Sequence, residues 1–267
     1  MKHIIYKGDT MHRIKEMVTD CVQVHLTVTS PPYYNAKEYN KEDVNVGNNE
    51  TYHDYMLKIE ELISDIYDVT IPGGIVVWNT SPVIYEGRRY PIPFDTNKIF
   101  MDNGFEFMED IVWVKPLGAA KLRCGGWFQN KGRPMTWHPN INTEYIMVYK
   151  KPGNREQKEF EPISKWYPQI PKDLTSCTWN INPETQKRYH DAPFPEEIPK
   201  RLILLYSYPG DTIFDPFAGT FTVSTMARKL GRNSIGIELS EKYIEYGKEN
   251  MGFHQKSLFE EIEYIEL

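Results

Sequence analysis

The sequence is poor in cysteine and has no long apolar run. Its 267 residues include three cysteines, Cys21, Cys124 and Cys177, which lie far apart and form no CxxC pair. This spacing argues against a disulfide framework or a zinc site and fits a reducing compartment. Nowhere do about 18 apolar residues follow one another, so no membrane span is expected. Residues 1–9 lack the apolar core of a signal peptide, and we therefore expect a cytoplasmic protein.

An excess of positive charge is also missing. The formal net charge is -6 at pH 7, which disfavours a protein that merely coats nucleic acid. An enzyme with a local basic cleft remains compatible with this charge. A chain of this length can form one α/β domain with a modest insertion.

Strands and helices are predicted to alternate, most regularly in the C-terminal third. Because the elements alternate, the strands are expected to pair in parallel within a doubly wound α/β sheet. Two segments outside this rhythm, residues 115–140 and 151–190, are predicted to be functional loops or a small inserted subdomain. The expected helices are residues 52–69, 195–206, 220–230 and 241–250, and the expected strands are residues 24–29, 75–78, 108–114, 145–149, 212–214 and 234–237.

A tight turn follows the strand expected at residues 212–214, and ligands in such sheets bind outside the carboxyl ends of the strands. Gly219 removes a side chain where the backbone must approach a ligand. Glu238 ends the next strand and can accept hydrogen bonds from ribose hydroxyls. Phe221 stands where a second glycine of the GxGxxG fingerprint would be, so a cofactor without phosphates, S-adenosylmethionine, is expected. The alternative is a plain strand-to-helix turn with an incidental surface glutamate.

A stiff turn ends the strand expected at residues 24–29. Pro31 and Pro32 fix their own φ and have no N–H, so nearby carbonyls can accept hydrogen bonds from a ligand. The Ser30 hydroxyl and the Pro31 carbonyl can each hold one hydrogen of an exocyclic base amine, turning its lone pair towards a methyl donor. Tyr33 would stack on the base, which must first leave the duplex. The alternative is a Pro-Pro turn packed by a core tyrosine.

Together these residues resemble the DNA amino-methyltransferases, which modify cytosine N4 or adenine N6. Residues 29–33 (TSPPY) resemble their catalytic (D/N/S)PP(Y/F) motif, and residues 215–220 (DPFAGT) resemble their cofactor motif. Residues 6–9 resemble the strand and acidic turn before the catalytic strand, and residues 192–195 resemble the segment that closes over the methionine part. The catalytic motif precedes the cofactor motif, as in the permuted β class.

The resemblance implies a single domain over residues 1–267 with a mostly parallel, Rossmann-like sheet of about seven strands. It also implies a target-recognition insertion at residues 151–190, short enough that residues 115–140 share in reading the DNA. Ser30, in place of aspartate, resembles the cytosine-N4 enzymes, whereas Phe221 departs from the family's usual second glycine. The implied catalytic residues are Ser30, Pro31, Pro32 and Tyr33, and the implied cofactor-binding residues are Asp9, Thr10, Thr29, Pro193, Phe194, Asp215, Phe217, Ala218, Gly219, Thr220 and Glu238.

Residues 115–140 combine five cations with two tryptophans and contain no acid. Cations for phosphates and aromatic rings for bases suit a loop that faces DNA, although a solvated basic loop is the alternative. Tyr34 and Lys37 follow the catalytic turn and could order over the target base. The predicted DNA contacts are Tyr34, Lys37, Lys121, Arg123, Lys131 and Arg133.

The predicted reaction is methyl transfer from S-adenosylmethionine to the exocyclic amine of a flipped base in double-stranded DNA, with cytosine N4 preferred and adenine N6 as the alternative. His138 and His190 lack partners at ligand spacing, so no metal site is expected. The cysteines lack the Pro-Cys context of a C5-methylating nucleophile. Methylation of RNA, a DNA-binding module without turnover and a nucleotide-dependent oxidoreductase are the rival functions. A bacterial, archaeal or phage source, a cognate restriction endonuclease, and either a monomer or a homodimer fit the sequence.

Overall fold

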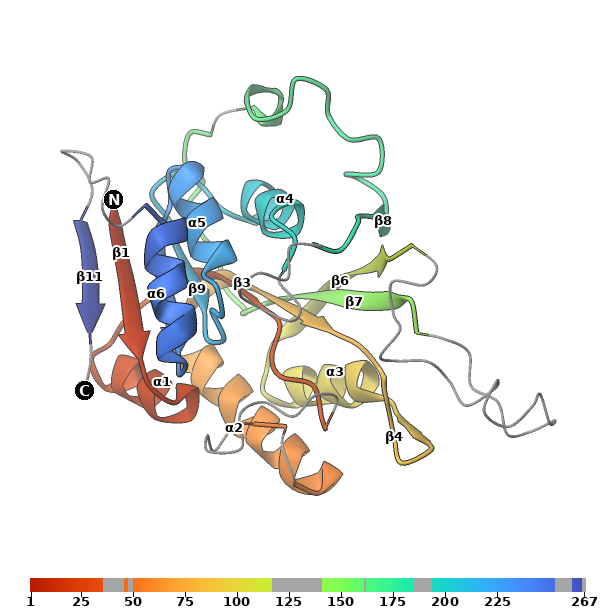
Figure 1. Ribbon diagram of the computed structural model, residues 1–267. Helices are drawn as coiled ribbons and strands as arrows, with labels where there is room; N and C mark the ends of the chain where they lie inside the picture. Colours follow the sequence, from red (N-terminus) through yellow and green to blue (C-terminus); the bar gives the residue numbers. More distant parts are fainter. Residues whose placement is uncertain are drawn as a thin grey trace.

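The computed structural model describes residues 1–35, 46–47, 50–116, 141–160, 162–184, 194–252 and 261–265. These residues form a nine-stranded sheet in the order β11-β1-β10-β9-β2-β3-β7-β6-β8, with helices on both faces (Figure 1). The predicted doubly wound, mostly parallel α/β class is confirmed. The sheet has nine strands where about seven were expected, because β8 (Thr178–Asn180) and β11 (Glu261–Ile265) extend it on its two sides.

One strand of the sheet runs against all the others described. β7 (Thr143–Lys150) is antiparallel to both neighbours, β3 and β6, whereas every other neighbouring pair is parallel. The carboxyl ends of the parallel strands therefore meet at one edge of the sheet, and β7 brings its amino end to the same edge. The parallel central strands are β1 (Lys2–Lys7), β2 (Val24–Thr29), β3 (Thr70–Thr80), β6 (Glu106–Val114), β9 (Thr212–Asp215) and β10 (Asn233–Glu238).

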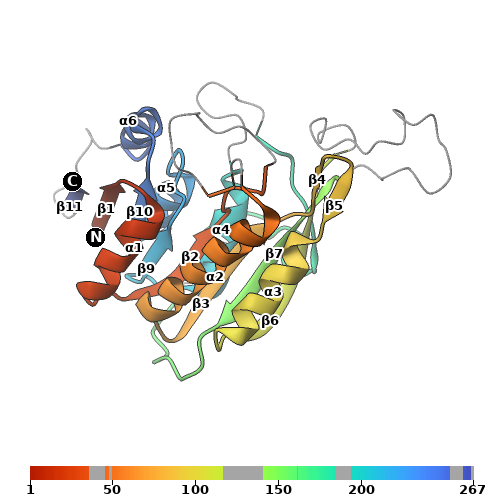
Figure 2. The ribbon, with the colours of Figure 1, turned by 90° about the horizontal axis from the view of Figure 1, so that it is seen from below.

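The helices divide between the two faces of the sheet (Figures 1 and 2). Alternate residues of β2 and β3 point to opposite faces, so Trp78 joins one apolar core while Leu26 and Val28 join the other. The first face carries α1 (Thr10–Thr19), α2 (Tyr52–Val69) and α3 (Ile92–Asp102), and the second carries α4 (Glu197–Tyr206), α5 (Thr222–Lys229) and α6 (Glu241–Asn250). A short hairpin, β4 (Val83–Tyr85) and β5 (Arg88–Tyr90), forms a separate two-stranded sheet.

Most predicted elements are confirmed, although several boundaries differ from those expected, two of them for a reason that the backbone shows. The helices expected at residues 52–69 and 241–250 have those bounds. The strand expected at residues 75–78 begins at Thr70, because the Pro-Gly-Gly sequence lies inside β3, beside a shift in its register with β2. The helix expected at residues 220–230 begins at Thr222, because Phe221 adopts a left-handed conformation with φ 59°.

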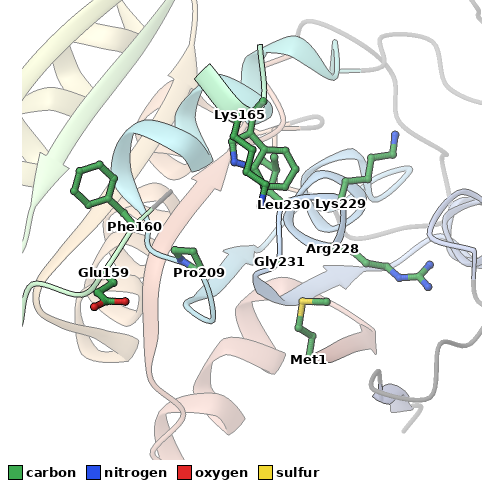
Figure 3. Close-up of a pocket in the computed structure, with 10 residues that line it drawn as sticks. Met1, Glu159, Phe160, Lys165, Pro209, Arg228, Lys229, Leu230 and Gly231 are labelled. Carbon is green, nitrogen blue, oxygen red and sulfur yellow. The ribbon is translucent and has the colours of Figure 1, made fainter. Parts of the chain in front are cut away.

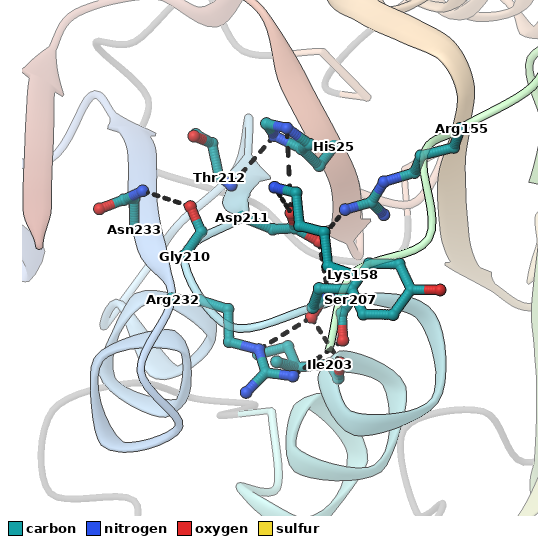
Figure 4. Close-up of polar contacts among 11 residues, drawn as sticks. His25, Arg155, Lys158, Ile203, Ser207, Gly210, Asp211, Thr212, Arg232 and Asn233 are labelled. Atoms are coloured by element: carbon teal, nitrogen blue, oxygen red, sulfur yellow. Dashed lines mark hydrogen bonds and ion pairs between the residues drawn. The ribbon is translucent and has the colours of Figure 1, made fainter. Parts of the chain in front are cut away.

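The amino-terminal edge of the sheet is held together by ion pairs (Figure 4). The Asp211 carboxylate is completely buried and accepts the Tyr208 N–H at 2.6 Å. It also pairs with the Arg155 guanidinium and, at 3.4 Å, with the Lys158 ammonium. His25 Nδ1 accepts the N–H of Thr212 at 3.1 Å. These contacts attach the segment that follows β7 to the start of β9.

A surface hollow of about 560 Å³ lies at this same edge (Figure 3). Phe160, Lys165 and Trp166 form one wall, and the end of α5 forms another. Pro209 and Gly231, which also line it, lead into β9 and β10. The hollow is therefore remote from the carboxyl edge, and none of its lining residues is a predicted site residue.

Candidate active site

The two turns selected from the sequence, the proline turn (residues 30–33) and the glycine turn (residues 215–220), lie side by side. β2 and β9 are parallel neighbours, paired at Leu26 with Ile213 and at Thr27 with Phe214, so both turns leave the same edge of the sheet. The Thr29 hydroxyl donates a hydrogen bond to Asp215 Oδ1 at 2.9 Å, and both side chains are buried. The expected meeting of the proline turn and the glycine turn is present in the structure.

The glycine turn is organised by two carboxylates. Asp215 Oδ1 also accepts the backbone N–H of Phe217 at 3.1 Å. Glu238, at the end of β10, accepts the N–H groups of Gly219 and Ser240, each at 2.8 Å, on different carboxylate oxygens. Gly219 has φ 51°, in the left-handed region that glycine adopts without strain. Burial raises the pKa of both Asp215 and Glu238 to about 7, against the opposing effect of these hydrogen bonds.

The start of α1 also lies at the carboxyl edge of the sheet, beside the glycine turn. Asp9 caps this helix by accepting the Met11 N–H at 2.9 Å, and the Thr10 hydroxyl donates to the carbonyl of Pro216. The backbone N–H of Gly8 donates to the carbonyl of Glu238 at 3.0 Å. The structure thus brings Asp9 and Thr10 against the glycine turn, where the cofactor prediction placed them.

Phe221 does not occupy the space where a cofactor would approach. Its ring is completely buried in a small apolar core with Ile5, Ala218 and Ile244. A side chain at Gly247 on α6 would collide with this ring, and a Cβ at Gly236 would lie 2.8 Å from it. The departure from the family's second glycine is therefore matched by glycines elsewhere, and Phe221 packs into the protein interior.

Hydrogen bonds to two polar side chains of β3 and β7, Asn79 and Glu144, hold the proline turn in place. These two residues were not selected in the sequence analysis. Tyr33 donates its hydroxyl hydrogen to Glu144 Oε2 at 2.8 Å. Asn79 Nδ2 lies 2.6 Å from the same oxygen, 3.1 Å from the Tyr33 hydroxyl and 3.2 Å from Ser30 Oγ. Lys115 Nζ pairs with the other oxygen of Glu144. The signal in the sequence was weak: single polar residues at the ends of the apolar runs that form β3 and β7.

The remaining predicted residues are placed as follows. Pro32 accepts a hydrogen bond from the Tyr55 hydroxyl at 3.1 Å, which anchors the turn to α2. Tyr34 was expected to contact DNA, but it is 4% exposed and packs among other tyrosines of α2 and the β4–β5 hairpin.

Phe194, which was expected to bind the cofactor, packs against Trp113, with ring centroids 6.4 Å apart. Ala218 and Thr220 are buried within the glycine turn. Pro193, Lys37, Lys121, Arg123, Lys131 and Arg133 lie outside the described residues.

Residues 24–249 match the sequence model of an N6/N4 methyltransferase family that is described as DNA methylase. The chain belongs to this family. This DNA methylase is 30% identical to the type II methyltransferase M.MjaI of Methanocaldococcus jannaschii, over 88% of this chain and 87% of that protein. It is 28% identical to M.MthZI of Methanothermobacter thermautotrophicus, over 82% of this chain and 69% of that protein.

Solved structures share the fold of this methylase. TTHA0409 from Thermus thermophilus, complexed with S-adenosyl-L-methionine, superposes with a TM-score of 0.72 at 25% identity and covers 98% of each chain. The cytosine-N4-specific PvuII DNA methyltransferase superposes with a TM-score of 0.69 at 18% identity, over 97% of this chain and 89% of that chain. The predictions of family, reaction class and cofactor are confirmed: the protein is an S-adenosylmethionine-dependent N6/N4 DNA methyltransferase. The oxidoreductase alternative is wrong.

Two further observations concern the described residues alone. They contain no group of three or more His, Cys, Asp or Glu side chains placed to hold a metal ion. Of the helices that they form, none has the length and apolar character needed to cross a membrane.

Proposed function

We propose that this methylase modifies the N4 amine of cytosine at a specific sequence in double-stranded DNA. The observation that carries the proposal is the position of Ser30, at the tip of a turn bonded to the glycine turn through Thr29 and Asp215. A serine at this place resembles the cytosine-N4 enzymes. Its neutral hydroxyl can accept one hydrogen of the amine while the Pro31 carbonyl accepts the other.

In this proposal the protein acts by orientation. Ser30 and Pro31 hold the amine so that its lone pair points towards the methyl donor, and Pro32 keeps the turn stiff. Tyr33, which is 8% exposed, would stack on the flipped base once its ring is uncovered. S-adenosylmethionine, when bound, supplies a methyl group on a positively charged sulfur. No covalent bond between protein and base is required.

The glycine turn would hold the methyl donor. The two oxygens of Glu238 each accept one backbone N–H, so each keeps a lone pair for a ribose hydroxyl. Gly219 leaves space for the ligand, and Asp215, Phe217 and Thr10 shape the turn around it. The carboxylates suit the hydroxyls and the positive charge of S-adenosylmethionine better than they would suit a pyrophosphate.

The remainder of the proposal concerns DNA and a partner. Residues 115–140 would contact the DNA backbone through Lys121, Arg123, Lys131 and Arg133. Within the recognition segment, residues 151–190, the part from β8 onwards would read the target sequence, because Arg155, Lys158 and Trp166 lie at the amino-terminal edge of the sheet, away from the two turns. Several relatives are named type II methyltransferases, which supports a role in protecting DNA from a cognate restriction endonuclease.

Expression in a host without endogenous DNA methylation, followed by single-molecule sequencing of the host DNA, tests the base and the site together. We expect N4-methylcytosine at one recurring sequence, and none in cells that express the Ser30→Ala variant. N6-methyladenine at a recurring sequence would contradict the choice of base. Unmodified DNA, despite folded protein in the cells, would contradict activity on duplex DNA.

A further inference from the structure

After a base amine is methylated, its nitrogen must lose a proton to an acceptor. The nitrogen lone pair forms the bond to the methyl carbon, and the sulfur keeps the electrons of the carbon–sulfur bond that breaks. The nitrogen then carries a positive charge until one of its hydrogens departs as a proton. Ser30, the residue proposed to touch this amine, is neutral and a poor base by itself.

The hydrogen bonds behind Ser30 lead to a buried carboxylate. Ser30 Oγ lies 3.3 Å from the Tyr33 hydroxyl, which donates to Glu144 at 2.8 Å. Since the single hydroxyl hydrogen of Tyr33 is given to Glu144, Ser30 must be the donor in the contact between the two hydroxyls. Every donor in this chain therefore points the same way, from the amine position towards Glu144.

Asn79 supports the same direction. Its amide nitrogen lies 2.6 Å from Glu144 Oε2 and 3.2 Å from Ser30 Oγ, so its two hydrogens can be shared between them. Ser30 Oγ then accepts one hydrogen from Asn79 and keeps its other lone pair for the amine. Lys115 compensates the charge of Glu144, whose side chain is 5% exposed. Pairing with Lys115 reduces the cost of burying this carboxylate.

We propose that Glu144 is the proton acceptor of the reaction, connected to the target amine through Ser30 and Tyr33. As the new nitrogen–carbon bond forms, a nitrogen proton moves to Ser30, the serine proton moves to Tyr33 and the tyrosine proton moves to Glu144. The balance is complete, because both hydroxyls are restored and Glu144 ends as a neutral acid that later releases its proton to water. An exocyclic base amine that has gained a fourth bond is a much stronger acid than a carboxylic acid, so the transfer is downhill.

The chain of hydrogen bonds from Ser30 to Glu144 also explains how a serine can contact the amine in place of an aspartate. Hydrogen bonds arranged head to tail polarise one another, so the charge of Glu144 makes Ser30 Oγ a stronger acceptor. Glu144 thus supplies through two hydroxyls what an aspartate at the turn would supply directly. This inference rests on the proposed placement of the amine at Ser30.

The test uses Tyr33→Phe, Glu144→Gln and the double variant of the full chain in single-turnover methylation of duplex DNA. We expect each single variant to lower the methyl-transfer rate by roughly 10- to 100-fold, with affinity for S-adenosylmethionine unchanged. The double variant should be no slower than the slower single variant, because either change breaks the same chain. At S-adenosylmethionine concentrations that saturate the protein at every pH, the wild-type protein should lose rate at low pH as Glu144 is protonated, and this acid limb should disappear in both single variants.

Tyr149→Phe is the matched control, since it removes a buried hydroxyl from the same strand, where Tyr149 bonds to Asn97 at 3.2 Å. It should leave the rate and the pH profile unchanged. Variants that keep the wild-type rate, additive losses in the double variant or an acid limb retained in Glu144→Gln would each overturn the relay. Tyr33→Phe leaves the Lys115–Glu144 pair intact, so it answers the question even if Glu144→Gln fails to fold. If the wild-type protein itself does not methylate duplex DNA, the proposed function fails instead.

Discussion

At the scale of single residues, Asp215 and Glu238 share an unusual state. Asp215 accepts a backbone N–H and the Thr29 hydroxyl, and Glu238 accepts backbone N–H groups; these hydrogen bonds favour the charged form, yet burial raises the pKa of each side chain to about 7. Both groups therefore change protonation close to neutral pH. A carboxylate that is to accept two ribose hydroxyls has to be ionised, so the affinity for the methyl donor should depend on pH.

The expected sign follows from the raised pKa of Glu238. Above about pH 7 the side chain is ionised and offers acceptors on both oxygens, whereas below it one oxygen becomes a donor. We expect the Kd for S-adenosylmethionine, measured by calorimetry without DNA, to rise about tenfold between about pH 8 and about pH 6. Glu238→Gln should weaken binding and flatten this dependence, leaving only the part due to Asp215. An affinity of the wild-type protein that does not vary over this range would contradict the ribose assignment.

At the scale of elements, the contact between α6 and Phe221 is a close fit. Gly247 lies on α6 against the Phe221 ring, with no room for a Cβ. Alanine usually stabilises a helix by about 1 kcal/mol relative to glycine, whereas overpacking a core costs about 1–3 kcal/mol. We expect the collision to dominate, so Gly247→Ala should lower the free energy of unfolding in urea. Lys242→Ala, on the exposed side of α6, should change it by less than about 0.5 kcal/mol.

A second variant tests whether collision with the Phe221 ring is the cause of the lower stability of Gly247→Ala. Phe221→Leu replaces the ring with a smaller side chain, so Gly247→Ala should lower the free energy of unfolding less in that background than in the wild type. Equal costs in the two backgrounds would show that the glycine is required for another reason.

The elements that could be predicted are those with a local signal. The apolar spacing of residues 52–69 gave α2, the alternation of strands and helices in the C-terminal third included α6, and the turn residues gave the two turns of the site. The length of β3 was not predictable, because Pro72 and two glycines usually break a strand and here lie beside a register shift. Asn79 and Glu144 were missed because they become neighbours only through the antiparallel pairing of β3 with β7. Long-range pairing of this kind leaves no local pattern.

At the scale of the whole molecule, Asp211 fastens the segment after β7 to the sheet, far from the proposed chemistry. Asp211→Ala would leave the Arg155 guanidinium, which is 14% exposed, without its carboxylate. We expect a loss of about 3 kcal/mol in the free energy of unfolding, measured by urea denaturation. Lys158, whose side chain is 45% exposed, pairs with the same carboxylate, and Lys158→Ala should cost less than about 1 kcal/mol. Equal losses from the two changes would contradict a dominant role for Arg155.

The hydrogen bond between Thr29 and Asp215 joins residues that are 186 positions apart in the chain. During synthesis the first of them leaves the ribosome long before the second exists. If the two turns have the proposed roles, a chain interrupted between these positions has the proline turn but lacks the turn that would hold the methyl donor. We therefore expect incomplete chains to be unable to methylate DNA.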